Sequence, residues 1–160
     1  MIIRGATCND AVEISRLIVP AASEQIAHEF GAEGRAALLA GMTPEAISKY
    51  MLQGYSYLLA DDVDGIVGIL GMRGYSHIYH LFVDRRRQRQ GIASQLWREA
   101  RRQSLAATRI SEFTVYSSRV AEAFYYQLGF RRSGDEQEKQ GVIAIPMRLA
   151  LNTSNGENDE

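Results

Sequence analysis

The stretch Leu81–Leu96, LFVDRRRQRQGIASQL, most constrains how this chain of 160 residues can fold. Its apolar start is typical of a strand, and the loop that follows passes through Gly91 into a helix. A loop of this kind can direct several backbone N–H groups at one point, where the helix dipole adds partial positive charge. The stretch therefore predicts a strand, a phosphate-binding loop and a helix packed on a sheet.

Composition favours one soluble domain in a reducing compartment. Hydrophobic residues make up 46% of the chain and charged residues 23%, which is ordinary for a globular protein. The net charge of −1 gives no general case for nucleic acid or an anionic membrane. We expect neither a membrane span nor a signal peptide, because polar residues interrupt every apolar run. A lone cysteine, Cys8, favours the cytoplasm. The histidines lack carboxylates at metal-ligand spacing, so no metal is expected.

The first third of the chain is predicted to be mainly helical after a short edge strand. Asn9 and Asp10 can cap a helix, which Pro20 should end near Val19. Residues 21 to 42 are less regular and suggest a helix broken near the glycines at 31 and 34. Thr43-Pro44 then starts another helix, with proline at its first position.

From residue 57 the apolar pattern becomes that of strands and helices in alternation. Strands are expected at 57–60 and 66–72, joined by a hairpin, and at 78–83, 110–116 and 143–149, with helices at 94–105 and 119–128. The predicted fold is a mixed α/β sheet with helices on both faces. The tail 152–160 is polar and acidic and is expected to be disordered, so the domain should span 1–151.

A second motif lies one strand and one helix after the phosphate loop. It runs AEAFYYQLGF from Ala121 to Phe130. The order of the two motifs resembles that of the GNAT superfamily of acyl-CoA-dependent N-acyltransferases. Gln88, Gly91 and Ala93 fit the loop pattern of that family, and the later signature is met by Ala121, Phe124, Tyr125, Leu128, Gly129 and Phe130. The resemblance covers about residues 2 to 150.

The resemblance implies one GNAT domain whose mostly antiparallel sheet splays at the acetyl-CoA site. Acetyl-CoA would be the co-substrate, and the resemblance places its contacts on Leu81, Phe82, Val83, Gln88, Arg89, Gln90, Gly91, Ile92, Ala93, Ser94, Ser118 and Tyr125. Leu81 and Val83 would offer main-chain groups to the acetyl and pantetheine parts. Ser118 stands where many members have asparagine, and its shorter side chain would reach the pantetheine arm only through water. Some of the arginines at 85–89 could reach the CoA 3′-phosphate, or simply be solvated.

Two side chains are candidates for proton transfer. Tyr125 resembles the family's general acid, which returns a proton to the CoA thiolate. His77 stands where several members carry a glutamate that takes a proton from the amine, although bulk water can serve instead. Strand alternation predicts that His77 and His80 point to opposite faces, with His80 a hydrogen-bonded core residue.

The sequence therefore predicts transfer of an acetyl group from acetyl-CoA to a primary amine by direct attack in a ternary complex. Alternatives from other classes are a CoA-binding sensor without turnover and an arginine-rich nucleic-acid binder. The second is disfavoured because the arginines are neither interleaved with aromatic residues nor accompanied by a basic helix. The acceptor would be met by residues 20 to 56, which hold His28, Glu24, Glu29 and Glu33. A small-molecule amine and a protein amine both remain open, and the family also implies a possible homodimer.

Overall fold

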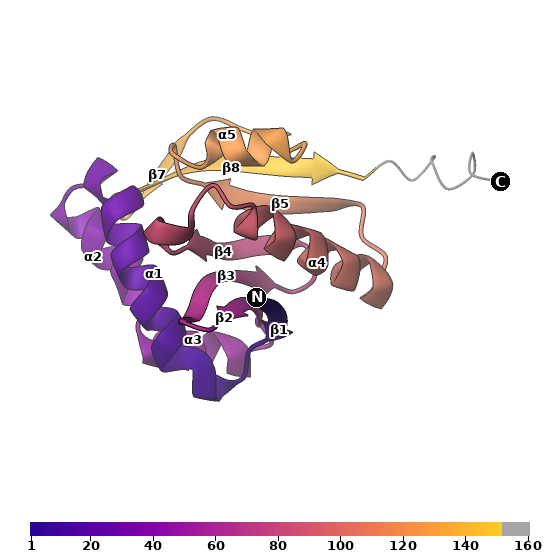
Figure 1. The fold of residues 1–160 in the computed structure, drawn as a ribbon. Helices are drawn as coiled ribbons and strands as arrows, with labels where there is room; N and C mark the ends of the chain where they lie inside the picture. The colour runs from indigo at the N-terminus through magenta and orange to yellow at the C-terminus, as the bar shows by residue number, and fades with distance from the viewer. Residues whose placement is uncertain (152–160) are drawn as a thin grey trace.

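An open sheet of eight strands forms the centre of the computed structural model, which describes residues 1–151 (Figure 1). The strands are β1 (Ile2–Gly5), β2 (Ser56–Asp62), β3 (Gly65–Arg73), β4 (His77–Val83), β5 (Glu112–Ser117), β6 (Arg131–Arg132), β7 (Gln137–Lys139) and β8 (Val142–Ala150). Their order is β1-β2-β3-β4-β5-β8-β6, with β7 paired to β8 beside this path. All described pairs are antiparallel except β4–β5. This confirms the predicted mixed, mostly antiparallel sheet.

Helices cover both faces of the sheet and bury two separate apolar clusters. The helices are α1 (Ala11–Gln25), α2 (Ala32–Ala40), α3 (Pro44–Leu52), α4 (Ile92–Ala107) and α5 (Glu122–Gln127). Helices α4 and α5 close one cluster with residues such as Leu96, Trp97 and Phe130. On the other face α1 and α3 supply Ile14, Ile18 and Ile47. Both faces are therefore apolar, as a sheet between two helical layers requires.

Helix α1 is longer than the sequence predicted, because Pro20 does not end it. The helix continues to Gln25 with the proline inside it. Pro20 lies on the exposed side, while Ala21 and Ala22 continue the buried stripe begun by Ile14 and Ile18. An internal proline costs about 3 kcal/mol of helix stability. Burial of the following turn offsets this cost, which is how tertiary packing overrides local propensity.

The glycines at 31 and 34 have different roles. Gly31 caps α2, so the predicted break near it is confirmed, whereas Gly34 lies inside the helix and does not break it. A Cβ on Gly34 would lie 2.1 Å from the carbonyl oxygen of Gly141, so only glycine permits this approach. Helix α2 is thus held backbone to backbone against the β7–β8 turn. Helix α3 begins as predicted, with the Thr43 hydroxyl accepting a bond from the Ala46 amide.

The parallel pair β4–β5 is short, and the two strands part after it. Pairing is confined to His77 with Thr114 and Ile78 with Val115. Just beyond this point β4 carries a bulge, since Ile78 and His80 oppose consecutive residues of β3 and leave Tyr79 unpaired. The sheet is therefore splayed in its middle, as the resemblance implied.

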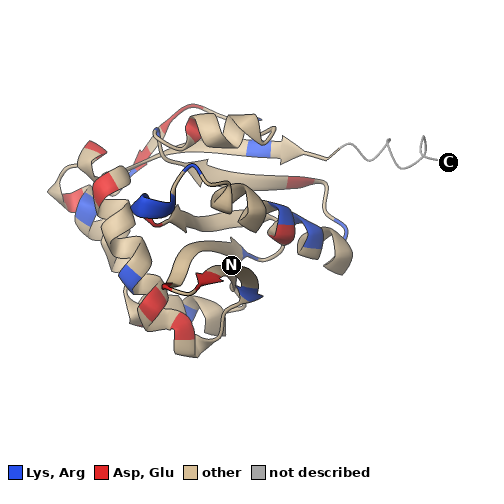
Figure 2. Ribbon diagram, in the orientation of Figure 1, with Lys and Arg blue, Asp and Glu red and all other residues tan. Residues whose placement is uncertain are grey.

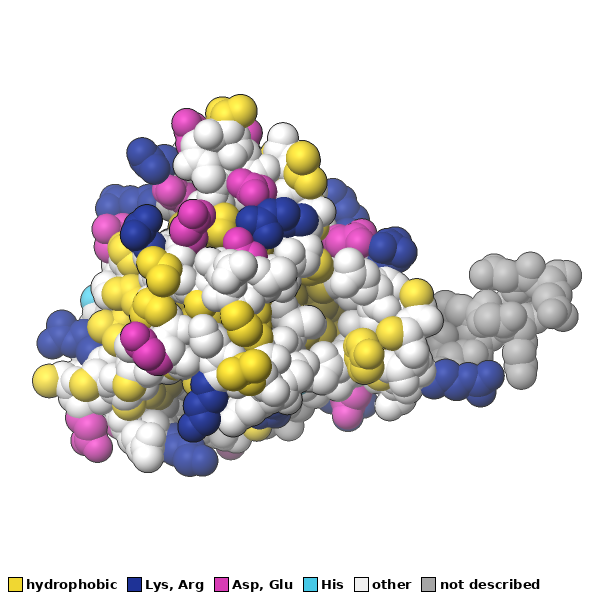
Figure 3. Space-filling view, turned by 90° about the horizontal axis from the view of Figure 1, so that it is seen from below, with side chains coloured by type: hydrophobic (Ala, Val, Ile, Leu, Met, Phe, Trp, Pro, Cys, Tyr) yellow, Lys and Arg dark blue, Asp and Glu magenta, His cyan; other side chains and the backbone are white. Residues whose placement is uncertain are grey.

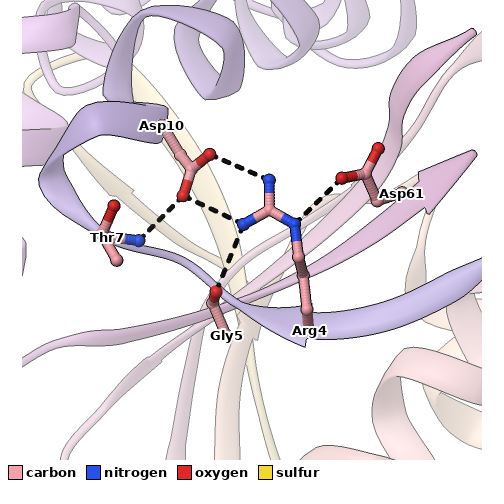
Figure 4. A network of polar contacts seen from close by, with 5 residues as sticks. All are labelled: Arg4, Gly5, Thr7, Asp10 and Asp61. Atoms are coloured by element: carbon pink, nitrogen blue, oxygen red, sulfur yellow. Dashed lines mark hydrogen bonds and ion pairs between the residues drawn. The ribbon is translucent and has the colours of Figure 1, made fainter.

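An arginine cluster ties the edge strand to the start of α1 (Figure 4). The Arg4 guanidinium donates to both carboxylate oxygens of Asp10, at 2.9 and 3.2 Å, and to Asp61 of β2 at 2.9 Å. Asp10 also accepts from the amide of Thr7 at 2.8 Å. Since these bonds favour the charged carboxylate, they lower the pKa of Asp10, with Arg4 the largest cause. The cluster fixes where the chain turns from β1 into α1.

Replacing Arg4 by methionine should lower the free energy of unfolding by about 1 kcal/mol, a modest value because the side chain is partly exposed. Urea denaturation at neutral pH measures this, with the exposed Arg98→Met as control. The pKa of Asp10 is lower in the folded than in the unfolded chain. The stabilisation is therefore present at pH values above the ordinary pKa of an aspartate, and it is lost as the pH falls through the pKa of folded Asp10. The difference between wild type and Arg4→Met should therefore shrink on acidification. Equal destabilisation by both variants would contradict the role of the cluster.

Candidate active site

The loop between β4 and α4 leaves a row of backbone amides without acceptors. Arg89 and Gly91 have positive φ of 62° and 79°, and α4 begins directly after Gly91 at Ile92. Within residues 1–151, no carbonyl or side chain accepts from the amides of residues 88 to 94. The Gln88 side chain donates to the Val83 carbonyl at 3.4 Å and closes the loop on itself. The geometry is that of an anion site at a helix N-terminus.

Three of the four arginines beside this loop are paired with carboxylates. Arg85 lies 3.5 Å from Glu24, Arg86 3.2 Å from Asp84, and Arg87 2.7 Å from Asp62. Figure 2 shows this basic turn after β4 next to α1, which carries acidic residues. Arg89 makes no ion pair within the described residues. Most of the local positive charge is therefore neutralised, and Arg89 is the arginine best placed to meet an added anion.

A cavity of about 370 Å³ lies where β4 and β5 separate. One wall is β4 from His77 to Phe82, and the opposite wall is the end of β5 with the turn into α5, including Ser118 and Ala121. Its roof comes from the end of α1, from α2 and from the start of β8. The volume is in the range of small-molecule sites. Of the predicted cofactor residues, Leu81, Phe82, Ser118 and Tyr125 line this cavity.

Tyr125 projects from α5 into the cavity lining and is almost fully buried. Its ring packs against Phe124 and Phe130, and its hydroxyl has no partner within residues 1–151. Burial raises the pKa of the phenol, so the group stays protonated throughout the neutral range. Ser118 accepts a bond from the amide of Ala121 at 3.1 Å and so fixes the start of this helical turn. The arrangement holds a phenol proton donor at one end of the cavity.

His77 and His80 lie on the same face of the sheet, so the prediction of opposite faces was wrong. The Tyr79 bulge adds one residue and shifts the alternation of side chains. His77 Nδ1 lies 2.8 Å from the Thr114 hydroxyl, and its ring contacts that of Tyr116. His80 Nδ1 lies 3.0 Å from the Tyr57 hydroxyl, deep in the core, which confirms it as a hydrogen-bonded core residue.

Both histidines are held neutral by their surroundings. Burial lowers the pKa of His77 to about 4, with the positive charge of Arg73 a smaller cause. Burial alone lowers the pKa of His80 to about 4. The Thr114 hydroxyl contacts Nδ1 of His77, and in the tautomer whose Nδ1–H donates to that hydroxyl, Nε2 carries the lone pair and can accept a proton. His77 therefore presents an uncharged imidazole to the cavity at physiological pH.

The residues singled out by sequence for contact with the acceptor are not the ones that line the cavity. His28, Glu24, Glu29 and Glu33 do not line the cavity, whereas Gln25, Tyr79 and Tyr116 do. Sequence reasoning singled out none of these three, although Gln25 lies within the range 20 to 56 that was expected to meet the acceptor. Tyr79 lies in the predicted strand and could have been noticed there, but the bulge that turns it toward Tyr50, at 3.0 Å between hydroxyls, has no sequence signal.

No metal centre or membrane span is evident in the described part of the chain. Among residues 1–151, no three His, Cys, Asp or Glu side chains gather closely enough to hold a metal ion. None of the helices there is long and apolar enough to cross a membrane.

A comparison with protein families matches residues 26–151 to the acetyltransferase (GNAT) domain. The match covers most of the chain, so the protein belongs to the GNAT acetyltransferase family. This confirms the resemblance seen in the two motifs. No curated protein sequence matches the chain.

Solved structures with the same fold include several acetyltransferases. A GCN5-related N-acetyltransferase from Rhodopseudomonas palustris aligns with a TM-score of 0.77 and 20% identity over 94% of this chain and 95% of its own. A PaiA N-acetyltransferase from Thermoplasma acidophilum, in complex with coenzyme A, gives 0.76 and 14% over 94% and 100%. An aminoglycoside 6′-N-acetyltransferase from Enterococcus faecium gives 0.69 and 15% over 94% and 97%. At these identities the likeness establishes the fold.

Neither His77 nor His80 should gain a proton above about pH 5, because both pKa values lie near 4. NMR titration of the imidazole C–H signals measures this, with the urea-unfolded chain as control, where both should titrate near the ordinary value of about 6.5. Since folding lowers both pKa values, the unfolded chain binds more protons between these limits. The free energy of unfolding should therefore fall as the pH drops from about 6.5 towards 4. A titration midpoint near 6.5 for the ring of His77 or His80 in the folded protein would contradict the burial of these rings.

Proposed function

We propose that this protein transfers the acetyl group of acetyl-CoA to a primary amine by direct attack in a ternary complex. The observation that carries the proposal is the cavity at the β4–β5 separation, which Tyr125 lines, together with the amide-lined loop that follows β4 outside this lining. The coenzyme A bound to the PaiA relative supports the choice of cofactor. Because the loop can bind pyrophosphate and the open strands can bind an extended arm, the site suits a long acyl-CoA rather than a short phosphate ester.

The proposed contacts follow the chain. Backbone amides of Gln88 to Ser94, including those of Gln90, Ile92 and Ala93, would bind the pyrophosphate. Main-chain groups of Leu81 and Val83, which have no strand partner on the β5 side, would bind the acetyl oxygen and the pantetheine amide. Phe82 and Ser118 would border the acyl group and the arm. Stabilising the oxyanion by a fixed N–H is the largest expected contribution to the rate.

In the reaction the amine nitrogen attacks the thioester carbonyl, the C–S bond breaks, and the sulfur leaves as a thiolate. Tyr125 donates its phenolic proton to that sulfur. Nε2 of His77 accepts a proton from the positively charged nitrogen of the adduct, with water at the cavity mouth as the alternative acceptor. The low pKa of His77 keeps this nitrogen unprotonated but makes it a weak base. No covalent enzyme intermediate is needed, and Cys8 lies outside the lining of the cavity.

The two other function classes are less well supported. A sensor without turnover would not need a buried phenol that stays protonated and has no partner within the described residues. Binding to nucleic acid would need a basic surface, but the arginines at 85–87 are paired with acids. On the face seen in Figure 3, basic and acidic side chains lie interspersed.

Replacing Tyr125 by phenylalanine tests the catalytic assignment. We expect turnover to fall by about 100-fold, a typical loss on removing a general acid, while the Kd for acetyl-CoA stays within about twofold. Thiol release with acetyl-CoA and a panel of amines, including peptides, antibiotics and polyamines, measures the first, and calorimetry the second. The exposed Tyr126→Phe is the matched control. Unchanged turnover in Tyr125→Phe would rule out the acid role, and a wild type that does not bind acetyl-CoA would overturn the function.

Replacing Arg89 by glutamine should weaken acetyl-CoA binding by about tenfold, as expected on losing a charged hydrogen bond to a phosphate. Arg86→Gln is the matched control and should change the Kd by less than about twofold, because Arg86 is already paired with Asp84. Calorimetry at two salt concentrations measures both. If Arg86→Gln has the larger effect, the assignment of Arg89 is wrong.

A further inference from the structure

The cavity wall contains no formal charge. Among its lining residues in the described chain there is no Asp, Glu, Lys or Arg. The roof is apolar, built from Ile26, Phe30, Ala37, Leu38 and Met42. The polar lining consists of neutral groups: hydroxyls, the Gln25 amide and two imidazoles whose pKa values lie near 4. A ligand that enters this space therefore finds no ion-pair partner for a charged group.

The nearest acidic side chains are not part of the cavity lining. Glu24 points to Arg85, with 3.5 Å between the charged atoms, and lies in a separate groove on the α1 side of the loop. Glu29 and Glu33 lie outside the lining, although Oε2 of Glu29, next to the lining residue Phe30, is buried without a hydrogen-bond partner among the described residues. The rim of the cavity is apolar as well, since Tyr116 and Val120 both line it and are more than half exposed. An acceptor would thus approach over aromatic and aliphatic surface.

From this lining we propose that the acceptor is a small primary amine on an uncharged, largely apolar body, and that polycationic amines and amino acids are excluded. The inference rests on the proposed acetyltransferase function and specifies its second substrate. A second ammonium or a carboxylate buried here would lose its hydration without gaining an opposite charge. Even the reacting amine gains from the site, because an uncharged cavity favours the neutral form that can attack the thioester.

Gln25 adds one specific polar contact. Its Nε2 is buried at the cavity and has no hydrogen-bond partner within the described residues. A buried amide donor without a partner costs about 1–3 kcal/mol. An oxygen of a bound ligand, such as a hydroxyl or a carbonyl, would satisfy it. The favoured acceptor body is thus apolar with a neutral oxygen near α1.

Two pairs of amines that differ by one charge test the proposal. Pentylamine and cadaverine differ by an ammonium group, and phenethylamine and phenylalanine by a carboxylate. With acetyl-CoA and the wild-type chain, we expect kcat/KM for each uncharged-body amine to exceed that of its charged partner by at least about tenfold, after correction for the neutral fraction. Thiol release and mass detection of the amide measure this.

A charge added to the roof gives an independent check. Ala37 of α2 lines the cavity and is partly exposed, so a longer side chain can be accommodated there. Ala37→Glu should raise the ratio of cadaverine to pentylamine turnover by about fivefold, the effect of one partly solvated ion pair. Ala37→Gln, equal in size and uncharged, should leave the ratio unchanged.

The outcomes separate the two levels of the proposal. Equal or better use of cadaverine or phenylalanine by the wild type would overturn the acceptor class. So would acetyl-CoA binding with no acetylation of any of the four amines, or a ratio unaffected by Ala37→Glu. Failure to bind acetyl-CoA in calorimetry would instead overturn the acetyltransferase function itself.

Discussion

The separation of β4 from β5 is the constraint on which the rest of the structure depends. Strands inside a sheet normally satisfy their amides and carbonyls on both sides, so opening a sheet in its middle leaves polar backbone groups unpaired. Here two residue pairs hold the strands together and the rest diverge. The free energy lost by leaving these amides and carbonyls unpaired must be offset by another group that bonds to them. An extended ligand with its own amides suits them, which ties the architecture directly to the shape of the cofactor.

The two ends of this opening are organised by different forces. At the end of β4, the chain reverses through residues with positive φ and presents unpaired amides, a fixed electrostatic feature of the backbone. At the end of β5, packing dominates: Phe130 and Trp97 hold the ring of Tyr125 against the α4 layer. Affinity for an anion and placement of a proton donor therefore come from separate elements on the same helical face. Anion binding by backbone amides should tolerate changes of side chain better than the placement of the Tyr125 ring does.

Much of the cofactor half could be predicted from the sequence, because its signals are local. Gln88, Gly91 and the Ala121–Phe130 motif each report on a few adjacent residues; Ala121 and Tyr125 line the cavity, whereas Gln88 and Gly91 lie in the loop after β4, outside its lining. What sequence reasoning missed depends on distant contacts. Pro20 stays helical because Ala21 and Ala22 are buried, and the two histidines share a face because Tyr79 is bulged against β3. The cavity roof is built from residues 25 to 42 with the start of β8, which lies a hundred or more positions further along the chain.

The contact between Gly34 and Gly141 bears on how this enzyme could acquire new acceptors. A helix docked partly through bare backbone depends less on its side chains to hold its position. Of the two α2 residues that line the cavity, Leu38 also packs against the apolar cluster of α1 and α3, whereas Ala37 is not part of that cluster and is the position where exchange disturbs the helix least. A library directed at position 37, with both glycines kept, would sample acceptor preference with little disturbance of the cofactor half. Substrate range could in that case change at this position with little effect on fold stability.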